Sequence, residues 1–404
     1  MSIRIKKSSI ILFAFLFLAD SCLWLFNARI RQGANELCWI AVFVAFMVWI
    51  LPNISKLKQS DFSYRNIVLF TLIMAVYSSI QSYLLHGQSL VQGFVPQRFM
   101  VGGFFLYFLI MQYINKRSGG LDTVINTIIF LSVIELTLYI LQYFLFGRFI
   151  FLKMSYSYRL EDVRLTFNAL AVPFAIFTSA NNLLTKDIGR IKNAILLAAG
   201  LFYSIGIGKT RLALVAFIAA FIGGYVIWRG TGGKKLFFFF VLLAGVIALT
   251  QTELFDYLIE GVNQVDASSQ TRVLGRAYYL QKIAEHPLFG GGYINTNNAA
   301  AVQYAGIYSI TIGNILWVDL GVYGLTFFFG IIGLLWFVRM YGKMTHMSYQ
   351  VAKKGNLTYW MYMIYLIVLM PNNTNFLWYL TNTVQFILLM CLLEGEYKRM
   401  NALN

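Results

Sequence analysis

Apolar runs long enough to cross a lipid bilayer recur along almost the whole chain, and this pattern restricts the fold more than any other feature. About 20 helical residues span a hydrocarbon core of ~30 Å. Backbone groups inside lipid must be satisfied within the protein, and runs of this length favour helices over barrel strands. With 59% hydrophobic and 12% charged residues, the composition differs from that of soluble domains. The sequence therefore predicts an all-α, polytopic integral membrane protein.

The apolar runs predict about twelve transmembrane helices within one membrane domain that covers residues 1–404. The basic stretch at the start precedes a run that is followed by span after span, so we interpret the first run as an uncleaved helix. The expected spans are 9–26, 37–54, 67–85, 100–114, 124–146, 169–184, 194–208, 211–228, 236–250, 321–338, 357–371 and 376–393.

Basic residues indicate the orientation. Most of them fall in loops on the side of the amino terminus, which predicts a cytoplasmic amino terminus. Two loops on the outer side are long enough for chemistry: residues 147–168, and residues 251–320 between spans nine and ten. Lysine dominates the inner loops and arginine the outer ones. Because arginine binds phosphate oxygens in pairs, the outer face predicts a phosphorylated ligand; neutralisation of lipid headgroups is the alternative. The charge is spread over short loops, so nucleic acid is not an expected partner.

The segment SSQTRVLGRAYYLQKIAEHPLFGGGY, residues 268–293, stands out in the longer loop. As a helix it places Arg272 and Arg276 on one face, with Tyr279 one turn further, so we expect an amphipathic helix. Pro287 disfavours helical geometry at the preceding residue, and the glycines up to Gly292 allow a tight backbone path. A helix that lies on the bilayer surface would show the same pattern.

The sequence GIGKT at 206–210 resembles the end of a phosphate-binding loop, but the full motif needs a glycine where Tyr203 stands. We therefore do not expect a nucleotide site. Lys209 and Arg211 precede and open a predicted helix, whose free N–H groups and dipole favour an anion. An arginine that reaches toward the lipid–water interface is the alternative interpretation.

Two acids fall inside predicted spans, Asp20 near an outer end and Glu135 near mid-membrane. A charge there costs on the order of 3 kcal/mol, so each acid should face a cavity or a partner. For Glu135 we consider both an arginine partner and a proton-relay role. The three histidines lie far apart, the outer loops hold no Asp-x-Asp, and the cysteines give no framework; the sequence therefore predicts no metal, no cofactor and no disulfide.

Four short motifs, taken in order, resemble the superfamily of O-antigen polymerases and O-antigen ligases of bacterial inner membranes. The resemblance covers roughly residues 124–340, and the two long loops are similar to that family's two functional periplasmic loops. The motifs are RLTFNALA (164–171), GKTRLALVAF (208–217), RVLGRAYYLQKIAEHPLFGGGY (272–293) and DLGVYGL (319–325).

The resemblance implies a metal-independent glycosyltransferase of the C-type membrane fold that acts on sugars carried by undecaprenyl pyrophosphate. Arg211 stands where the family has the arginine of a Ser-Arg-like helix start, with Thr210 in place of serine. Arg276 matches the arginine of the family's later loop, and Gly292 matches the glycine that follows that arginine at the family's spacing. Arg164 stands for the arginine of the earlier loop, ahead of Asn168.

By this reading the pyrophosphate and its sugar would be held by a set of outer residues. Arg276, Arg211 and Arg272 would stabilise charge on the leaving pyrophosphate. Asp319, Glu161 and Asp162 are candidate bases for the acceptor hydroxyl, although Asp319 could equally cap a helix. Residues expected to bind substrate are Arg164, Arg159, Lys209, Asn168, Tyr279 and Gly292.

One position separates the two branches of the family. The ligase pattern has a histidine ahead of Gly-x-x-Gly; counting back from Gly321 and Gly324 puts Ile310 there, followed by Thr311. An isoleucine cannot transfer a proton, so the polymerase is favoured, with the ligase as the alternative and a lipid-linked oligosaccharide flippase as a further one. The expected partners are the lipid-linked oligosaccharide, membrane lipid and a chain-length regulator protein. The expected location is the bacterial inner membrane, with the site facing the periplasm.

Overall fold

The computed structural model describes residues 7–56, 61–159, 162–186, 189–230, 267–309, 313–315 and 317–402. The described chain is mostly helical. Within the described residues, six helical stretches are long and apolar enough to cross a membrane, so the protein is a membrane-embedded, multi-pass protein. These stretches are Ala28–Ser55, Arg65–His86, Leu90–Lys116, Gly120–Leu145, Arg190–Ile207 and Val322–Lys353, and shorter apolar helices cover Ser9–Ala19, Leu212–Ile227 and Thr358–Leu369.

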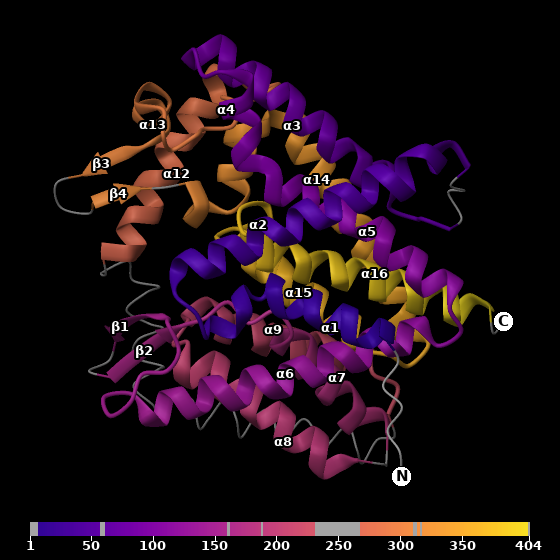
Figure 1. Ribbon diagram of the computed structural model, residues 1–404. Coiled ribbons are helices and arrows are strands. Elements are labelled where there is room, and N and C mark those ends of the chain that lie inside the picture. The colour runs from indigo at the N-terminus through magenta and orange to yellow at the C-terminus, as the bar shows by residue number, and fades with distance from the viewer. Residues whose placement is uncertain are drawn as a thin grey trace.

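Figure 1 shows the helices in chain order, from indigo at the amino terminus to yellow at the carboxyl terminus. The first half of the described chain contains α1 (Lys7–Ala19), η1 (Ser21–Trp24), α2 (Ala28–Ala45), η2 (Phe46–Ile50), η3 (Leu51–Lys56), α3 (Arg65–His86), α4 (Leu90–Phe94), η4 (Val95–Gln97), α5 (Arg98–Lys116), α6 (Gly120–Leu145), α7 (Val172–Thr185), α8 (Arg190–Leu201), η5 (Phe202–Ile207) and α9 (Arg211–Ile227). The second half contains α12 (Ala267–Glu285), α13 (Ala299–Ala305), η6 (Trp317–Leu320), α14 (Val322–Lys353), α15 (Thr358–Leu369), η7 (Asn375–Leu377) and α16 (Leu380–Ala402).

Eleven of the predicted spans overlap one of these helices, whereas the span predicted at 236–250 and the loop start at 251–266 lie outside the described residues. Helix α2 begins well before the predicted residue 37, because the Asn27 side chain accepts a hydrogen bond from the Ile30 N–H and caps the helix over a polar stretch. Helix α14 also runs far beyond residue 338, to Lys353. Hydropathy finds the apolar centre of such helices and misses their polar ends.

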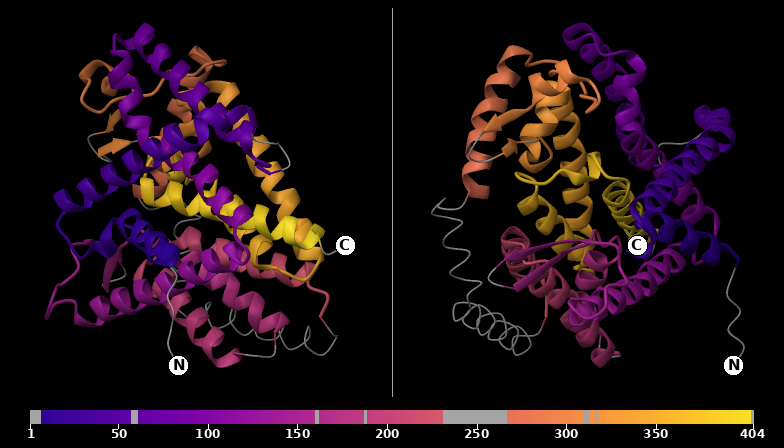
Figure 2. Two further views of the ribbon diagram at one scale, coloured as in Figure 1. Left: turned by 45° about the vertical axis from the view of Figure 1, so that its right-hand side comes forward. Right: turned by 60° about the vertical axis from the view of Figure 1, so that its left-hand side comes forward.

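Two short antiparallel hairpins depart from a purely helical chain. Strand β1 (Ser155–Arg159) pairs with β2 (Asp162–Thr166), and β3 (Ile307–Ser309) pairs with β4 (Gly313–Ile315). The first hairpin falls in the predicted loop 147–168, where alternating tyrosines and serines suit an exposed strand. These strands, α12 and α13 lie at one end of the bundle, on the left in Figure 1 and seen again in Figure 2, opposite the two termini. We call this the α12 end.

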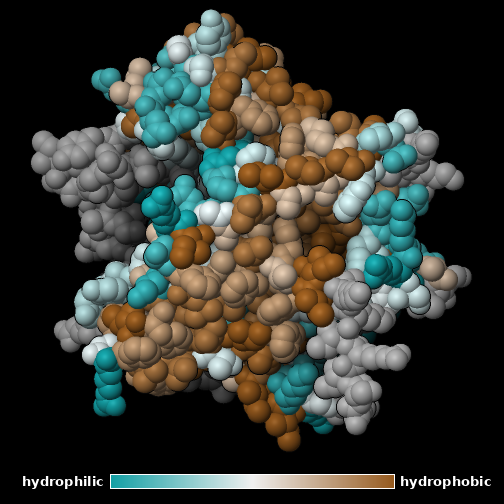
Figure 3. Space-filling model, viewed as in Figure 1, coloured by the Kyte–Doolittle hydropathy of each residue, from teal (hydrophilic) through white to brown (hydrophobic). Residues whose placement is uncertain are grey.

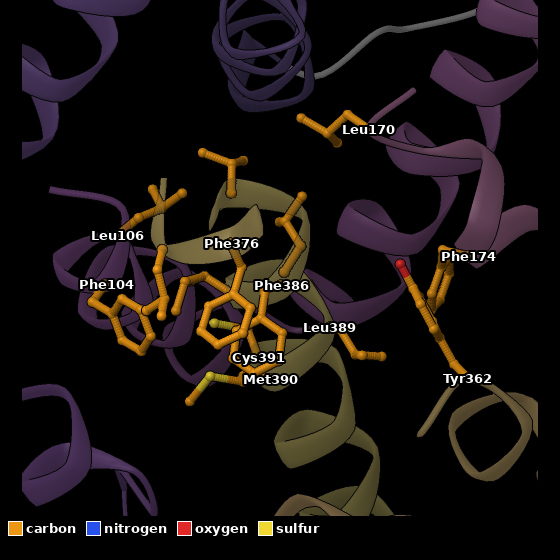
Figure 4. Close-up of a cluster of buried hydrophobic side chains, with 14 of the residues drawn as sticks. Phe104, Leu106, Leu170, Phe174, Tyr362, Phe376, Phe386, Leu389, Met390 and Cys391 are labelled. Atoms are coloured by element: carbon orange, nitrogen blue, oxygen red, sulfur yellow. The ribbon is translucent and has the colours of Figure 1, made fainter. Parts of the chain in front are cut away.

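Helix α16 runs through the middle of the bundle, and between Leu380 and Glu396 all of its residues except the partly exposed Asn382 and Gln385 are buried. Its Phe386 stacks on Phe376 of η7 with ring centroids 4.3 Å apart, and both rings approach Phe104 of α5 (Figure 4). The surface in Figure 3 shows a hydrophobic belt between hydrophilic groups at the α12 end and at the end that carries the termini. An apolar belt of this kind is what a bilayer covers.

Candidate functional site at the α12 end of the bundle

Helix α12 carries the two arginines that the sequence places on one face. The Arg276 Nη2 donates to Asn372 Oδ1 at 2.6 Å, and its Cζ lies 5.8 Å from the ring centroid of Tyr323. The Arg276 Nε is buried and has no hydrogen-bond partner among the described residues. Arg272, one turn earlier, is partly exposed. In the described part of the chain no carboxylate lies within ion-pair distance of either guanidinium. The pair therefore keeps donors for an anionic ligand.

Tyr279 lies on the buried side of the same helix. It is 0% exposed, its hydroxyl donates to the Ala305 carbonyl, and its ring packs edge-on against Phe327 at 4.8 Å. Burial raises the pKa of the hydroxyl. These contacts anchor α12 on α13 and α14. The substrate contact expected for Tyr279 stays a prediction.

The segment after α12 is built into a break in α14. At Gly330 the backbone of α14 has φ 63° and ψ −162°, which is not helical. The Ile331 N–H donates to the Pro287 carbonyl at 2.8 Å, and the Gly291 N–H donates to the Phe327 carbonyl at 2.7 Å. Carbonyl and amide groups freed by the break are thus satisfied by residues 287–291.

On its other side the same segment contacts α3. The Tyr293 carbonyl accepts from Ser82 Oγ at 2.9 Å and from Gln88 Nε2 at 2.8 Å, and the Gly291 carbonyl lies 2.9 Å from His86 Nε2. Gly292 has φ +77°, and a Cβ there would lie 2.4 Å from the Ser82 backbone N. Gly292 is therefore required by close backbone approach. Its predicted place beside substrate stays a prediction.

A second group of predicted residues surrounds the first hairpin. Arg164 on β2 donates from Nε to the Gly208 carbonyl at 2.8 Å, which ties the hairpin to the turn before α9. In that turn Lys209 has φ +43° and is 7% exposed, so the turn is tight and its lysine is held inward. Asn168, between β2 and α7, is partly exposed. The predictions for Arg159 and Arg211 concern side chains that lie outside those the structure describes.

The two acids flagged in the sequence meet below this second group. Glu135 of α6 is fully buried, and its carboxylate oxygens accept the N–H groups of Ala171 and Val172 at 3.1 Å. The Leu170 N–H donates both to Glu135 Oε1 at 3.1 Å and to Asp20 Oδ1 at 3.2 Å. Both acids thus cap the amino terminus of α7, where the helix dipole favours negative charge. The arginine partner considered for Glu135 is wrong for the described residues, because backbone amides take that place.

The peptide that the acids hold is also fixed by aromatic residues. Phe167 stacks on Tyr139 with ring centroids 4.2 Å apart, and its carbonyl accepts from the Tyr203 hydroxyl at 3.1 Å. Trp24 meets the same ring edge-on at 6.3 Å. Segment 164–172 is therefore held by α6, η5 and η1 together.

Arg31 is a further arginine at the α12 end, and the sequence did not predict a functional role for it. Its Cζ lies 4.0 Å from the Trp24 ring centroid, and its Nε is buried without a hydrogen-bond partner among the described residues. The Asn35 Oδ1, one turn further along α2, is likewise buried and unpartnered in the described chain. The sequence does contain a signal for Arg31 and Asn35, because the start of α2 is polar inside an otherwise apolar region. For Asn372 the sequence signal is weaker, and consists only of its place in the polar run PNNTN.

Asp319 lies in η6, immediately before α14, with its side chain exposed. The structure therefore brings together Arg272, Arg276 and Asn372 in one group, and Arg164 with the Lys209 turn in another. Both groups lie at the α12 end, and among the described residues no hydrogen bond or ion pair joins them.

Within the described ranges, no group of three or more histidine, cysteine, aspartate or glutamate side chains could hold a metal ion. The described cysteines Cys22, Cys38 and Cys391 are free and buried.

Comparison of the chain with protein-family models, with curated proteins and with solved structures gives no match. The resemblance to the O-antigen polymerase and ligase superfamily therefore stays a hypothesis based on short motifs.

Proposed function

We propose that this protein is a glycosyltransferase of the O-antigen polymerase kind. It would transfer a growing polysaccharide from undecaprenyl pyrophosphate to a single repeat unit on a second undecaprenyl pyrophosphate. Its twelve spans would lie in the bacterial inner membrane, in the C-type arrangement, with the α12 end in the periplasm. A chain-length regulator protein is the proposed protein partner.

One observation carries the proposal. Arg276 approaches Asn372 with one guanidinium nitrogen and keeps a second, buried nitrogen unpaired among the described residues, at the same end of the bundle as Arg164 and the Lys209 turn. Buried donors that lack a partner favour an anion strongly, because leaving them unpaired costs free energy. A pyrophosphate supplies several oxygens to such a cluster.

In the proposed reaction the glycosidic bond to the pyrophosphate breaks, and negative charge grows on the leaving phosphate oxygens. Arg276 and Arg272 would bind those oxygens most strongly in the transition state, which lowers the barrier. Arg211 would add the amino terminus of α9 and its own charge. Asp319 is the candidate to accept the proton of the acceptor hydroxyl, since it is exposed at the same end.

Deletion of the gene in its host, followed by electrophoresis of lipopolysaccharide, tests the proposal. Loss of a polymerase leaves lipid A core capped with one repeat unit. Bare core with polymer retained on its carrier would indicate the ligase instead. Bare core with neither a single repeat unit attached nor polymer on the carrier would indicate a flippase. An unchanged ladder in the deletion strain, with capsule and exopolysaccharide also unchanged, would contradict all three assignments.

A further inference from the structure

Asp20 and Glu135 come from distant parts of the sequence and meet in the interior. Both are 0% exposed, and the single N–H of Leu170 donates to an oxygen of each carboxyl group. Because they share this one N–H donor, the two carboxyl groups lie side by side. Two carboxyl groups held this close in a buried site cannot both carry a charge without a large energetic penalty, so one of the two acids holds a proton.

The surroundings supply donors for one negative charge. Three successive amides at the start of α7, those of Leu170, Ala171 and Val172, point at the pair. The Tyr139 hydroxyl of α6 donates to Asp20 Oδ2 at 3.4 Å, and the ring of Tyr203 of η5 lies 5.6 Å from the Tyr139 ring. In the described chain no lysine or arginine lies within ion-pair distance of either acid. Two adjacent charges without a cation would repel each other in this low-dielectric interior.

We propose that Asp20 and Glu135 share one proton and act as a positioning pair for the anion-binding segment 164–172. This inference rests on the proposed function, because the segment matters only if Arg164 and Asn168 contact the substrate. The acids do not touch the substrate themselves. They fix the peptide that leads from β2 into α7.

The geometry links the acid pair to the group that contains Arg164 and the Lys209 turn, in two steps. Glu135 holds the amides of residues 170–172, and Tyr203 donates to the Phe167 carbonyl at 3.1 Å in the same peptide. Arg164, three residues before Phe167, then reaches the Gly208 carbonyl beside Lys209. A second negative charge on the pair would therefore act next to the peptide that carries the residues proposed to bind pyrophosphate, and would weaken anion binding.

Glutamine is the informative substitution at position 135. In Glu135→Gln the amide oxygen can accept from the α7 amides while the amide NH₂ donates to an ionised Asp20, which reproduces the hydrogen bonds without a titrating proton. Glu135→Ala removes the acceptor and leaves the amides of α7 unpaired. Glu394→Gln is the matched control, because Glu394 is also a fully buried carboxylate, bound to the Ser63 N–H and the Tyr107 hydroxyl.

Infrared spectroscopy of the full-length protein in lipid nanodiscs tests the shared proton. We expect the carbonyl band of a protonated carboxylic acid in the wild type, loss of that band in both Glu135→Gln and Asp20→Asn, and no change in Glu394→Gln. Absence of the band in the wild type would overturn the proposal, as would its persistence in either single variant.

Binding of inorganic pyrophosphate to the same samples tests the positioning role. We expect the dissociation constant to rise about tenfold in Glu135→Ala, as for loss of a hydrogen bond to a charged group, and to stay at the wild-type value in Glu135→Gln and Glu394→Gln. Wild-type affinity in a folded Glu135→Ala protein would overturn the positioning role. If the wild type does not bind pyrophosphate, the proposed function fails, whereas the infrared result still decides the shared proton.

Discussion

The two arginine groups at the α12 end are anchored in opposite ways. The segment beside Arg276 is fixed by neutral backbone contacts: residues 287–293 exchange hydrogen bonds with the broken helix α14 and with α3. The segment that carries Arg164 is fixed by two buried acids at the start of α7. The first anchorage depends on close packing, and the second depends on hydrogen-bond acceptors.

This difference determines which substitutions each region tolerates. Close backbone packing admits no added carbon, so the glycine segment should fail through steric strain. A carboxylate cap admits an uncharged acceptor of the same shape, so the second region should tolerate glutamine and fail with alanine. Substitutions in each segment therefore separate these two modes of anchorage from the chemistry of the arginines.

Gly292→Ala should have the largest effect. The new Cβ would lie 2.4 Å from the Ser82 backbone N, at φ +77°, and we expect a loss of roughly 3 kcal/mol in stability from overpacking and backbone strain. Thermal unfolding of the purified protein measures it. Gly342→Ala in α14 is the control, because no atom lies within 4 Å of its added Cβ. Equal stability of the two variants would contradict the close packing described for Gly292.

Arg276→Ala should abolish polymerisation and leave the fold intact. Removal of one preorganised donor to a developing charge lowers the rate by about 100- to 1,000-fold. Arg276→Lys should restore little, since an ammonium group cannot contact Asn372 and bind two phosphate oxygens in the planar fork geometry. The lipopolysaccharide ladder and the amount of protein in the membrane are the measurements. The control is Arg148→Ala, an exposed arginine at the same end, and a normal ladder in Arg276→Ala would rule out the assignment of this residue.

The sequence predicts the parts of this architecture that depend on local patterns. Hydropathy locates eleven helices in the described chain, and the spacing of Arg272 and Arg276 predicts α12 with both arginines on one face. The sequence also marks Asp20 and Glu135 as acids that need partners, because they fall inside apolar spans. Each of these inferences uses residues within a few turns of one another.

The contacts that complete the site join residues far apart in the sequence. Asn372 reaches Arg276 across 96 positions, and Asp20 reaches Leu170 across 150. The break at Gly330 is equally hidden, because a single glycine in an apolar run is tolerated in many membrane helices. Periodicity describes one helix at a time and carries no information about which helix packs beside it.

Asn372→Asp should weaken the site more than Asn372→Ala. Alanine removes the amide that orients Arg276, which we expect to reduce pyrophosphate affinity about tenfold. Aspartate keeps an acceptor of the same shape but adds a charge that binds the arginine in place of the ligand, so affinity should fall further. Asn373→Asp adds the same charge one residue away, where the side chain only accepts from the Asn375 N–H at 2.9 Å. Equal effects of the two aspartates would indicate general repulsion of the anion and not competition for Arg276.

The smallest effects are expected from two tyrosines, one in each region. Tyr279→Phe removes the hydroxyl that donates to the Ala305 carbonyl, and Tyr203→Phe removes the one that donates to the Phe167 carbonyl. Each loss should cost about 1 kcal/mol of stability. Tyr203 also packs against Tyr139, whose hydroxyl donates to Asp20, so only Tyr203→Phe should shift the infrared band of the shared proton. Measurement of both the unfolding temperature and that band therefore separates a purely structural hydroxyl from one that is coupled to the acids. A band shift of the same size in Tyr279→Phe would contradict the division between the two regions.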